Sequence, residues 1–120
     1  MSNKKCGDSI NNDNVKYVGN VYSTKLNNFD VGENAEAYAS TMCSVEDKVT
    51  GIIFKMKPGW FEYGYDHDEV FLVLEGEVRI KDQISGRIIE LRKGDLIQIY
   101  KEAKLHFVSD KGFKCWAVTC

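Results

Sequence analysis

The stretch that decides the fold runs from Tyr65 to Glu77 and has the sequence YDHDEVFLVLEGE. Charged residues open it, an apolar run begins at Val70, and Glu75-Gly76 predicts a turn into a new strand of alternating character. This pattern predicts a carboxylate at the mouth of a small β-barrel, with a hairpin closed behind it. A second element of the same kind begins at Gly94, where GDLIQIY again joins a glycine turn to a strand.

The rest of the chain is a succession of short strand-like runs separated by turn residues. Alternation puts Ile52, Phe54 and Met56 on one face of such a strand. About ten runs of this kind, one proline and no amphipathic helix predict an all-β barrel or jelly roll over residues 15–120. Residues 1–14 are polar, and we expect them to form a flexible tail.

Composition and charge exclude several classes of function. The 120 residues are enough for one domain with a single core. The net charge of -2 and the mixed signs along the chain argue against nucleic-acid binding. No apolar run approaches the roughly 18 residues of a membrane span, and the first residues lack the apolar segment of a signal peptide. We therefore expect a cytoplasmic protein that binds neither nucleic acid nor a membrane.

The four cysteines show no paired or zinc-like spacing: Cys6, Cys43, Cys115 and Cys120. In a reducing compartment this spacing predicts free thiols. Cys115 alternates within an apolar run, which predicts a small core residue.

Glu69 is the first candidate for a functional group. It opens a strand, and Phe71 lies two residues later, so both side chains are predicted to point into the barrel. A carboxylate in an apolar interior is costly unless it binds a metal, accepts hydrogen bonds or takes up a proton. The sequence therefore predicts a metal ligand or a catalytic acid or base, with Tyr65 beside it in the catalytic group. A structural carboxylate held by neighbouring tyrosines is the alternative.

Aromatic side chains gather just before Glu69. Tyr63 and Tyr65 are two residues apart and share a face, and Trp60 is nearby. Together with Phe71 they predict an aromatic mouth that binds a small polar ligand. Core packing and a subunit interface form the alternative interpretation.

The two histidines are candidate metal ligands. His67 lies two residues before Glu69, and His106 is the other histidine of the chain. Two imidazoles and one carboxylate suit Fe(II), Mn(II), Ni(II) or Zn(II). A divalent metal held by His67, Glu69 and His106 is therefore one expectation, and a metal-free site is the other.

On these residues the chain resembles the cupin superfamily of single-domain, double-stranded β-helix (jelly-roll) barrels. Glu69 and Gly76 keep the spacing that closes the typical first cupin motif, and Gly94 matches the start of the second. The usual His-x-His positions of the first motif hold Tyr63 and Tyr65.

In the second motif, the resemblance places Tyr100 where a proline is usual, and hence at the pocket rim as a ligand-binding residue. Leu105 occupies the usual histidine position, and His106 follows it. A slip of one residue turns a side chain to the opposite face of a strand. His106 is therefore expected to reach the pocket only if a bulge intervenes.

Within the cupins, the run from Tyr65 to Gly76 looks most like the EutQ branch of ethanolamine-utilisation proteins, and a related branch of single-domain cupins is nearly as similar. That resemblance implies a homodimer, formed by sheet pairing or by an exchanged edge strand over residues 15–22. It also implies an acetate kinase-like activity and association with a bacterial microcompartment. The residues themselves show no glycine-rich phosphate loop, which argues against phosphoryl transfer.

Two function classes stay open at this point. The first is an enzyme that acts on a small molecule bound in the barrel. The second is a non-catalytic cupin, for metabolite sensing or assembly, that has lost the usual metal site.

Overall fold

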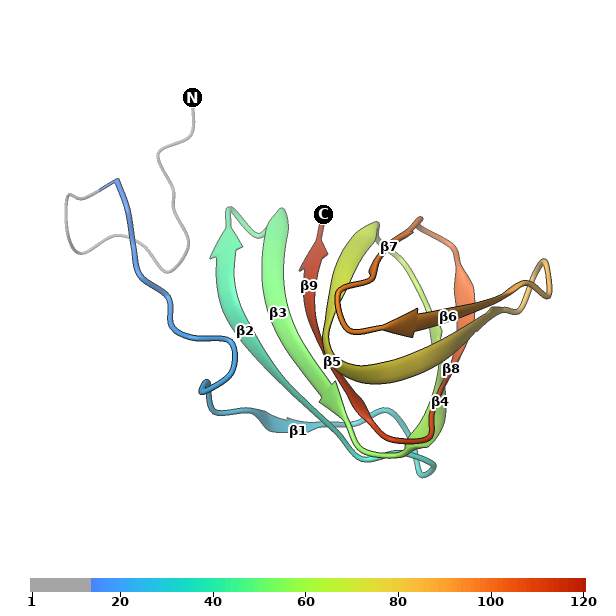
Figure 1. The fold of residues 1–120 in the computed structure, drawn as a ribbon. Coiled ribbons are helices and arrows are strands. Elements are labelled where there is room, and N and C mark those ends of the chain that lie inside the picture. The colour runs from blue at the N-terminus through green and yellow to red at the C-terminus, as the bar shows by residue number, and fades with distance from the viewer. Residues whose placement is uncertain (1–13) are drawn as a thin grey trace.

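The computed structural model describes residues 14–120, and within this range it contains β-strands and no helix (Figure 1). The strands are β1 (Asn27–Phe29), β2 (Ala37–Val45), β3 (Val49–Met56), β4 (Gly59–Gly64), β5 (Glu69–Asp82), β6 (Ile88–Arg92), β7 (Leu96–Ile99), β8 (Lys104–Ser109) and β9 (Phe113–Thr119). The predicted all-β fold is confirmed. In the part of the chain that is described, no helix has the length and apolarity that crossing a membrane requires.

Antiparallel pairing joins the strands in the order β1-β2-β3-β9-β5-β8-β4, and β6 and β7 also pair with β5. Figure 1 shows the strands curling around a common interior to form half of a barrel. β2, β3 and β9 make one wall, and β4 and β8 make the facing wall. Strand β5 connects the two walls, because its two halves pair with different neighbours.

The middle of β5 differs from the prediction. The sequence predicts a turn at Glu75-Gly76, but the strand continues from Glu69 to Asp82. The register shifts between Val73 and Glu75, and Gly76 has a φ of 77°. A bulge and a left-handed glycine bend a strand without ending it. The hairpin prediction at this position is therefore wrong, and one bent strand serves both walls.

Alternation along β3 is confirmed. Ile52 and Phe54 face the barrel interior, and Met56 on the same face is 1% exposed. Ile53 on the opposite face is also fully buried, and it pairs with Trp116 of β9. At its central residues β3 is therefore buried on both faces, which agrees with its apolar side chains on both sides there.

Residues 15–26 form no strand and run along the outside of the barrel near β2 (Figure 1). Nζ of Lys114, a buried residue of β9, lies 5.3 Å from the ring centroid of Tyr22. This cation–π contact holds part of the segment against the outer face of the wall. Within this single chain residues 15–22 form no strand, and the homodimer, by sheet pairing or by an exchanged edge strand over residues 15–22, stays a prediction. The tail expected over residues 1–14 lies outside the described residues, apart from Asn14.

Candidate functional site

The inner faces of the strands line a cavity of about 350 Å³. All six phenylalanines of the chain are among its lining residues: Phe29, Phe54, Phe61, Phe71, Phe107 and Phe113. A largely apolar cavity of this size with a few polar groups is the usual form of a small-ligand site.

Strand register sorts the cavity lining by polarity. At one end Thr50 pairs with Thr119, which in turn pairs with Glu69. Moving along the strands, the next two rows are apolar: Ile52, Ala117 and Phe71, then Phe54, Cys115 and Val73. Because paired residues share a face of the sheet, one end of the cavity is polar and the remainder is apolar.

Glu69 lies at the polar end between the side chains of Tyr65 and His67. The Tyr65 hydroxyl donates a hydrogen bond of 3.3 Å to Oε2 of Glu69. On the other side, Nε2 of His67 lies 3.7 Å from Oε1 of Glu69, which is beyond hydrogen-bonding distance. Nε2 is buried, and it has no hydrogen-bond partner among the described residues.

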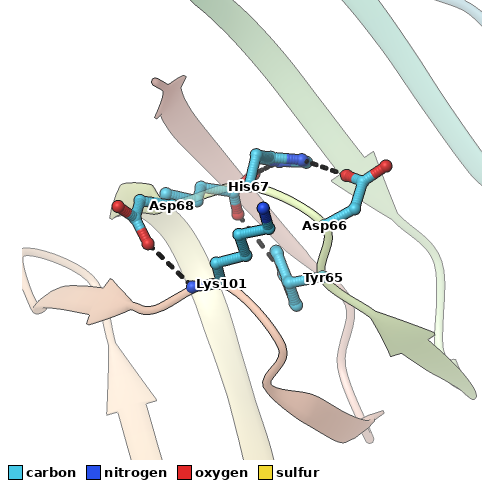
Figure 2. A network of polar contacts seen from close by, with 6 residues as sticks. Tyr65, Asp66, His67, Asp68 and Lys101 are labelled. Carbon is cyan, nitrogen blue, oxygen red and sulfur yellow. Dashed lines mark hydrogen bonds and ion pairs between the residues drawn. The ribbon is translucent and has the colours of Figure 1, made fainter.

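Asp66 fixes the orientation of the His67 ring (Figure 2). Nδ1 of His67 lies 2.7 Å from Oδ1 of Asp66, and this hydrogen bond lowers the pKa of the Asp66 carboxyl group. An ionised carboxylate can only accept, so Nδ1 carries the proton and donates it. In the tautomer with the proton on Nδ1, the imidazole presents Nε2 as an acceptor beside Glu69.

Burial dominates the electrostatics of the site. It raises the pKa of the Glu69 carboxyl group, and the neighbouring His67 and the hydrogen bond from Tyr65 oppose this shift. Burial also raises the pKa of the Tyr65 phenol, and the Glu69 charge adds to the effect. The Cys115 thiol, deeper in the cavity, has its pKa raised by the same two causes. Tyr65 and Cys115 therefore stay protonated at neutral pH, and Glu69 is the group of the three that can change its charge.

The loop that presents these residues is anchored on both sides. The Lys101 N–H donates a 2.7 Å hydrogen bond to Oδ1 of Asp68 (Figure 2). The backbone of Asp68 exchanges hydrogen bonds of 3.3 and 3.0 Å with Cys120, and the Tyr65 N–H donates to the carbonyl of Ala103 at 2.9 Å. Short backbone bonds of this kind keep His67 close to Glu69, although His67 precedes the first residue of β5.

Five of the residues predicted from the sequence line this cavity: Tyr63, Tyr65, His67, Glu69 and Phe71. Three others do not. Trp60 and His106 lie on the outer faces of β4 and β8, where their rings stack at 5.2 Å, and Tyr100 is 66% exposed beyond the end of β7. No bulge brings His106 inward, because β4 and β8 pair without a register shift. The catalytic roles of Glu69 and Tyr65 and the ligand-binding roles of Tyr63, Tyr65 and Phe71 stay predictions.

The expected metal set is not brought together. His67 and Glu69 share the cavity, but His106 is on the other side of β8, opposite Glu62. Within residues 14–120, no three side chains of His, Cys, Asp or Glu are grouped so that they could hold a metal ion. Structural and catalytic metal centres usually need three or more protein ligands. The donor set of this cavity does not fit such a centre.

Sequence reasoning missed Asp66 as the partner of His67, and it missed the phenylalanines of β8 and β9 as cavity lining. The second omission could have been avoided. Phe113 and Thr119 have the same parity as Cys115, which was predicted to lie in the core. The contact between Asp66 and His67 depends on the path of a loop and has no counterpart in the spacing of residues.

The fold and the cavity together define a small cupin barrel with a polar rim. Residues 44–114, more than half of the chain, match the family described as the EutQ-like cupin domain. The chain therefore belongs to the EutQ-like cupin domain family, as the motif around Glu69 predicts. No curated protein matches its sequence.

Solved structures of cupins share the fold. EutQ from Clostridium difficile has a TM-score of 0.73 and 23% identity, over 82% of each chain. An ethanolamine utilization protein Q from Salmonella typhimurium LT2 has a TM-score of 0.73 and 21% identity, over 82% of this chain and 80% of that one. The polyketide cyclase RemF from Streptomyces resistomycificus has a TM-score of 0.72 and 17% identity, over 88% and 79%. At these identities the likeness shows the jelly-roll fold alone.

Proposed function

We propose that the protein is an enzyme that moves a proton on a small organic molecule bound in the barrel, with Glu69 as the group that takes and returns the proton. One observation carries this proposal. The half-buried carboxyl group of Glu69 stands between the Tyr65 hydroxyl at 3.3 Å and the unpartnered Nε2 of His67 at 3.7 Å. A carboxyl group with these neighbours can change protonation state without meeting bulk water.

The residues beside Glu69 supply a hydrogen-bond donor and a proton acceptor for the proposed proton transfer. Glu69 accepts a proton from a C–H or O–H bond of the ligand, while the hydrogen bond from Tyr65 to Oε2 holds the carboxylate in position. A small movement of the two side chains brings Nε2 of His67 within hydrogen-bonding distance of Oε1, the proton then passes to Nε2, and Asp66 stabilises the imidazolium that forms. The exposed fraction of the side chain rises from 13% at Glu69 to 28% at His67 and 91% at Asp66. These side chains thus connect the cavity to solvent.

The acetate kinase-like activity implied by the resemblance is not supported by the lining of this cavity. No lysine or arginine is among the lining residues. Phosphoryl transfer depends on cationic groups or metal ions that neutralise the phosphate oxygens. We therefore place proton transfer ahead of phosphoryl transfer, and propose no step that requires phosphate binding.

Deuterium incorporation tests the proposal. Small ketones ranging in size from acetone to 2-tetralone are incubated with the protein in D2O, and exchange of the C–H next to the carbonyl is followed by proton NMR. We expect exchange above the uncatalysed rate for at least one ketone, and loss of that excess in Glu69→Gln. Glu62→Gln is the matched control, because Glu62 is exposed on β4 and bonded to Gln83. Equal exchange in Glu69→Gln and wild type would refute the proposal.

A second candidate is a non-catalytic cupin that only binds a ligand. It is favoured by Tyr63 and Tyr65, which stand where the cupin motif usually has histidines, and whose rings pack edge to face at 4.7 Å. Under this alternative, a ligand binds in the cavity and its protons never exchange faster than in buffer.

A further inference from the structure

The geometry of the cavity points to the chemical class of its ligand. We propose that the site binds an amphipathic molecule with a flat apolar body of about ten to fifteen non-hydrogen atoms, one hydrogen-bonding head group and no negative charge. The head group lies beside Glu69, and the body fills the phenylalanine-lined part. The proposal rests on the proposed function only for the role of the head group.

The apolar body is indicated by the ring arrangement at the inner end of the cavity. Phe61 and Phe107 stack at 4.6 Å with an angle of 5° between their planes. Phe54 lies 5.8 Å from Phe61 and 5.7 Å from Phe113, in tilted arrangements. These rings are held in place by one another and present ring surfaces and edges to the cavity, which is the environment that another planar ring system prefers.

The size of the body follows from the volume. An engineered cavity of about 150 Å³ accommodates benzene, and this cavity measures about 350 Å³. It therefore has room for about twice the volume of one six-membered ring, which corresponds to two fused or linked rings. A two-carbon acyl compound would leave most of the phenylalanine surface without a partner, and would lose the dispersion contacts that this surface offers.

The single head group follows from the strand register. Polar lining side chains are gathered at the end of the cavity where Thr50, Thr119 and Glu69 form one row. The rows beyond them contain only Cys115 as a polar side chain, and its thiol is a weak hydrogen-bonding group. A ligand with polar groups at both ends would bury one of them without a partner, at a cost of roughly 1–3 kcal/mol.

Charge excludes anionic head groups. None of the lining residues is a lysine or an arginine, and the carboxyl group of Glu69 is at the polar end. A phosphate or carboxylate would lose its hydration there, find no lysine or arginine to replace it, and stand beside the carboxylate of Glu69. The proposed ligands therefore differ from acyl phosphates in both size and charge.

Isothermal titration calorimetry with three matched probes tests the ligand class on the full chain: 1-naphthol, naphthalene and 1-naphthyl phosphate. We expect 1-naphthol to bind in the cavity and the phosphate to bind at least about tenfold more weakly. Naphthalene should bind several-fold more weakly than 1-naphthol, because it lacks the hydrogen bond. Acetyl phosphate should give no heat of binding. Failure of 1-naphthol to bind, or equal binding of 1-naphthyl phosphate, would overturn the inference.

A blocking variant locates the binding. Ala39 lines the cavity and pairs with Phe54, so Ala39→Phe should abolish 1-naphthol binding. Ser40→Phe, one residue along on the opposite face of β2, should leave it unchanged. Methyl NMR of the wild type gives the same information if Ala39→Phe does not fold. In that measurement, 1-naphthol shifts the Ile52 and Ala117 signals and leaves exposed Ile88 unchanged; the reverse pattern contradicts the inference.

The two proposals fail in different experiments. If 1-naphthol binds and Ala39→Phe blocks it, but no ketone exchanges its protons, the ligand class stands and the enzymatic proposal is lost. If ketones exchange through Glu69 but 1-naphthyl phosphate binds as tightly as 1-naphthol, the enzymatic proposal stands and the proposed ligand class is lost.

Discussion

Replacement of Gly76 and of Gly86 by alanine forms a matched pair that tests the bend in β5. The two glycines have nearly equal backbone angles, with φ of 77° and 79°. An alanine in this left-handed region costs roughly 1–2 kcal/mol at either position. They differ in their surroundings. A Cβ atom at Gly86 meets nothing within 4 Å, whereas one at Gly76 collides with the carbonyl oxygen of Gly112 and lies 2.8 Å from Cα of Phe113.

The size of the expected difference follows from these contacts. Gly86→Ala should lower the free energy of unfolding by only the strain, roughly 1–2 kcal/mol. Gly76→Ala adds overpacking against backbone atoms of the paired segment, worth roughly 1–3 kcal/mol more. A chain of this length is stable by roughly 6–18 kcal/mol, so both variants should fold and can be compared.

Urea unfolding followed by circular dichroism measures the difference. We expect a lower midpoint for Gly76→Ala than for Gly86→Ala, at similar m-values. Midpoints that agree within error would show that β5 does not depend on the close approach of Gly112, and would refute the account of the bend.

Three further predictions concern the site. Burial raises the pKa of Glu69 above its ordinary value of 4.5, so the native state holds this proton more tightly than the unfolded state, and stability falls as pH rises from 4.5 through the native pKa. Glu69→Gln should therefore gain stability relative to wild type as pH rises, and a constant difference between pH 4 and 8 in urea titrations would contradict this. Phe61→Ala should cost about 3–5 kcal/mol, since Phe61 is 7% exposed and stacked on Phe107; a loss below about 1 kcal/mol in the same assay would contradict the packing described. Elemental analysis of protein purified without a histidine tag should find less than one metal ion per chain, because His106 cannot join His67 at the cavity; one ion per chain that is lost in Glu69→Ala would contradict it.

Local alternation predicted the parts of the fold that depend on neighbouring residues only. The shared face of Ile52 and Phe54, and that of Glu69 and Phe71, follow from the period of two along a strand. Trp60 was grouped with Tyr63 because it is near in sequence, but its parity places it on the opposite face, where the structure has it.

Features set by distant parts of the chain could not be predicted. A glycine after a strand can end it or bend it, and at Gly76 the outcome depends on Gly112, which lies far along the chain. Likewise, the position of His67 depends on the hydrogen bonds between Asp68 and Cys120. Contacts of this range leave no periodic pattern in the sequence, so the polar end of the cavity had to be seen in three dimensions.

The bent strand β5 also determines how cooperatively the protein unfolds. β5 is hydrogen-bonded to β6, β7, β8 and β9, so separation of either wall removes hydrogen bonds from the strand that also holds the other wall. Separation of the wall of β2, β3 and β9 and separation of the wall of β4 and β8 are therefore expected to occur together, in a single cooperative event. Amide protons at the two ends of β5, near Val70 and near Ile80, should therefore exchange with solvent at the rate of global unfolding, and a ligand held beside Glu69 should slow both equally.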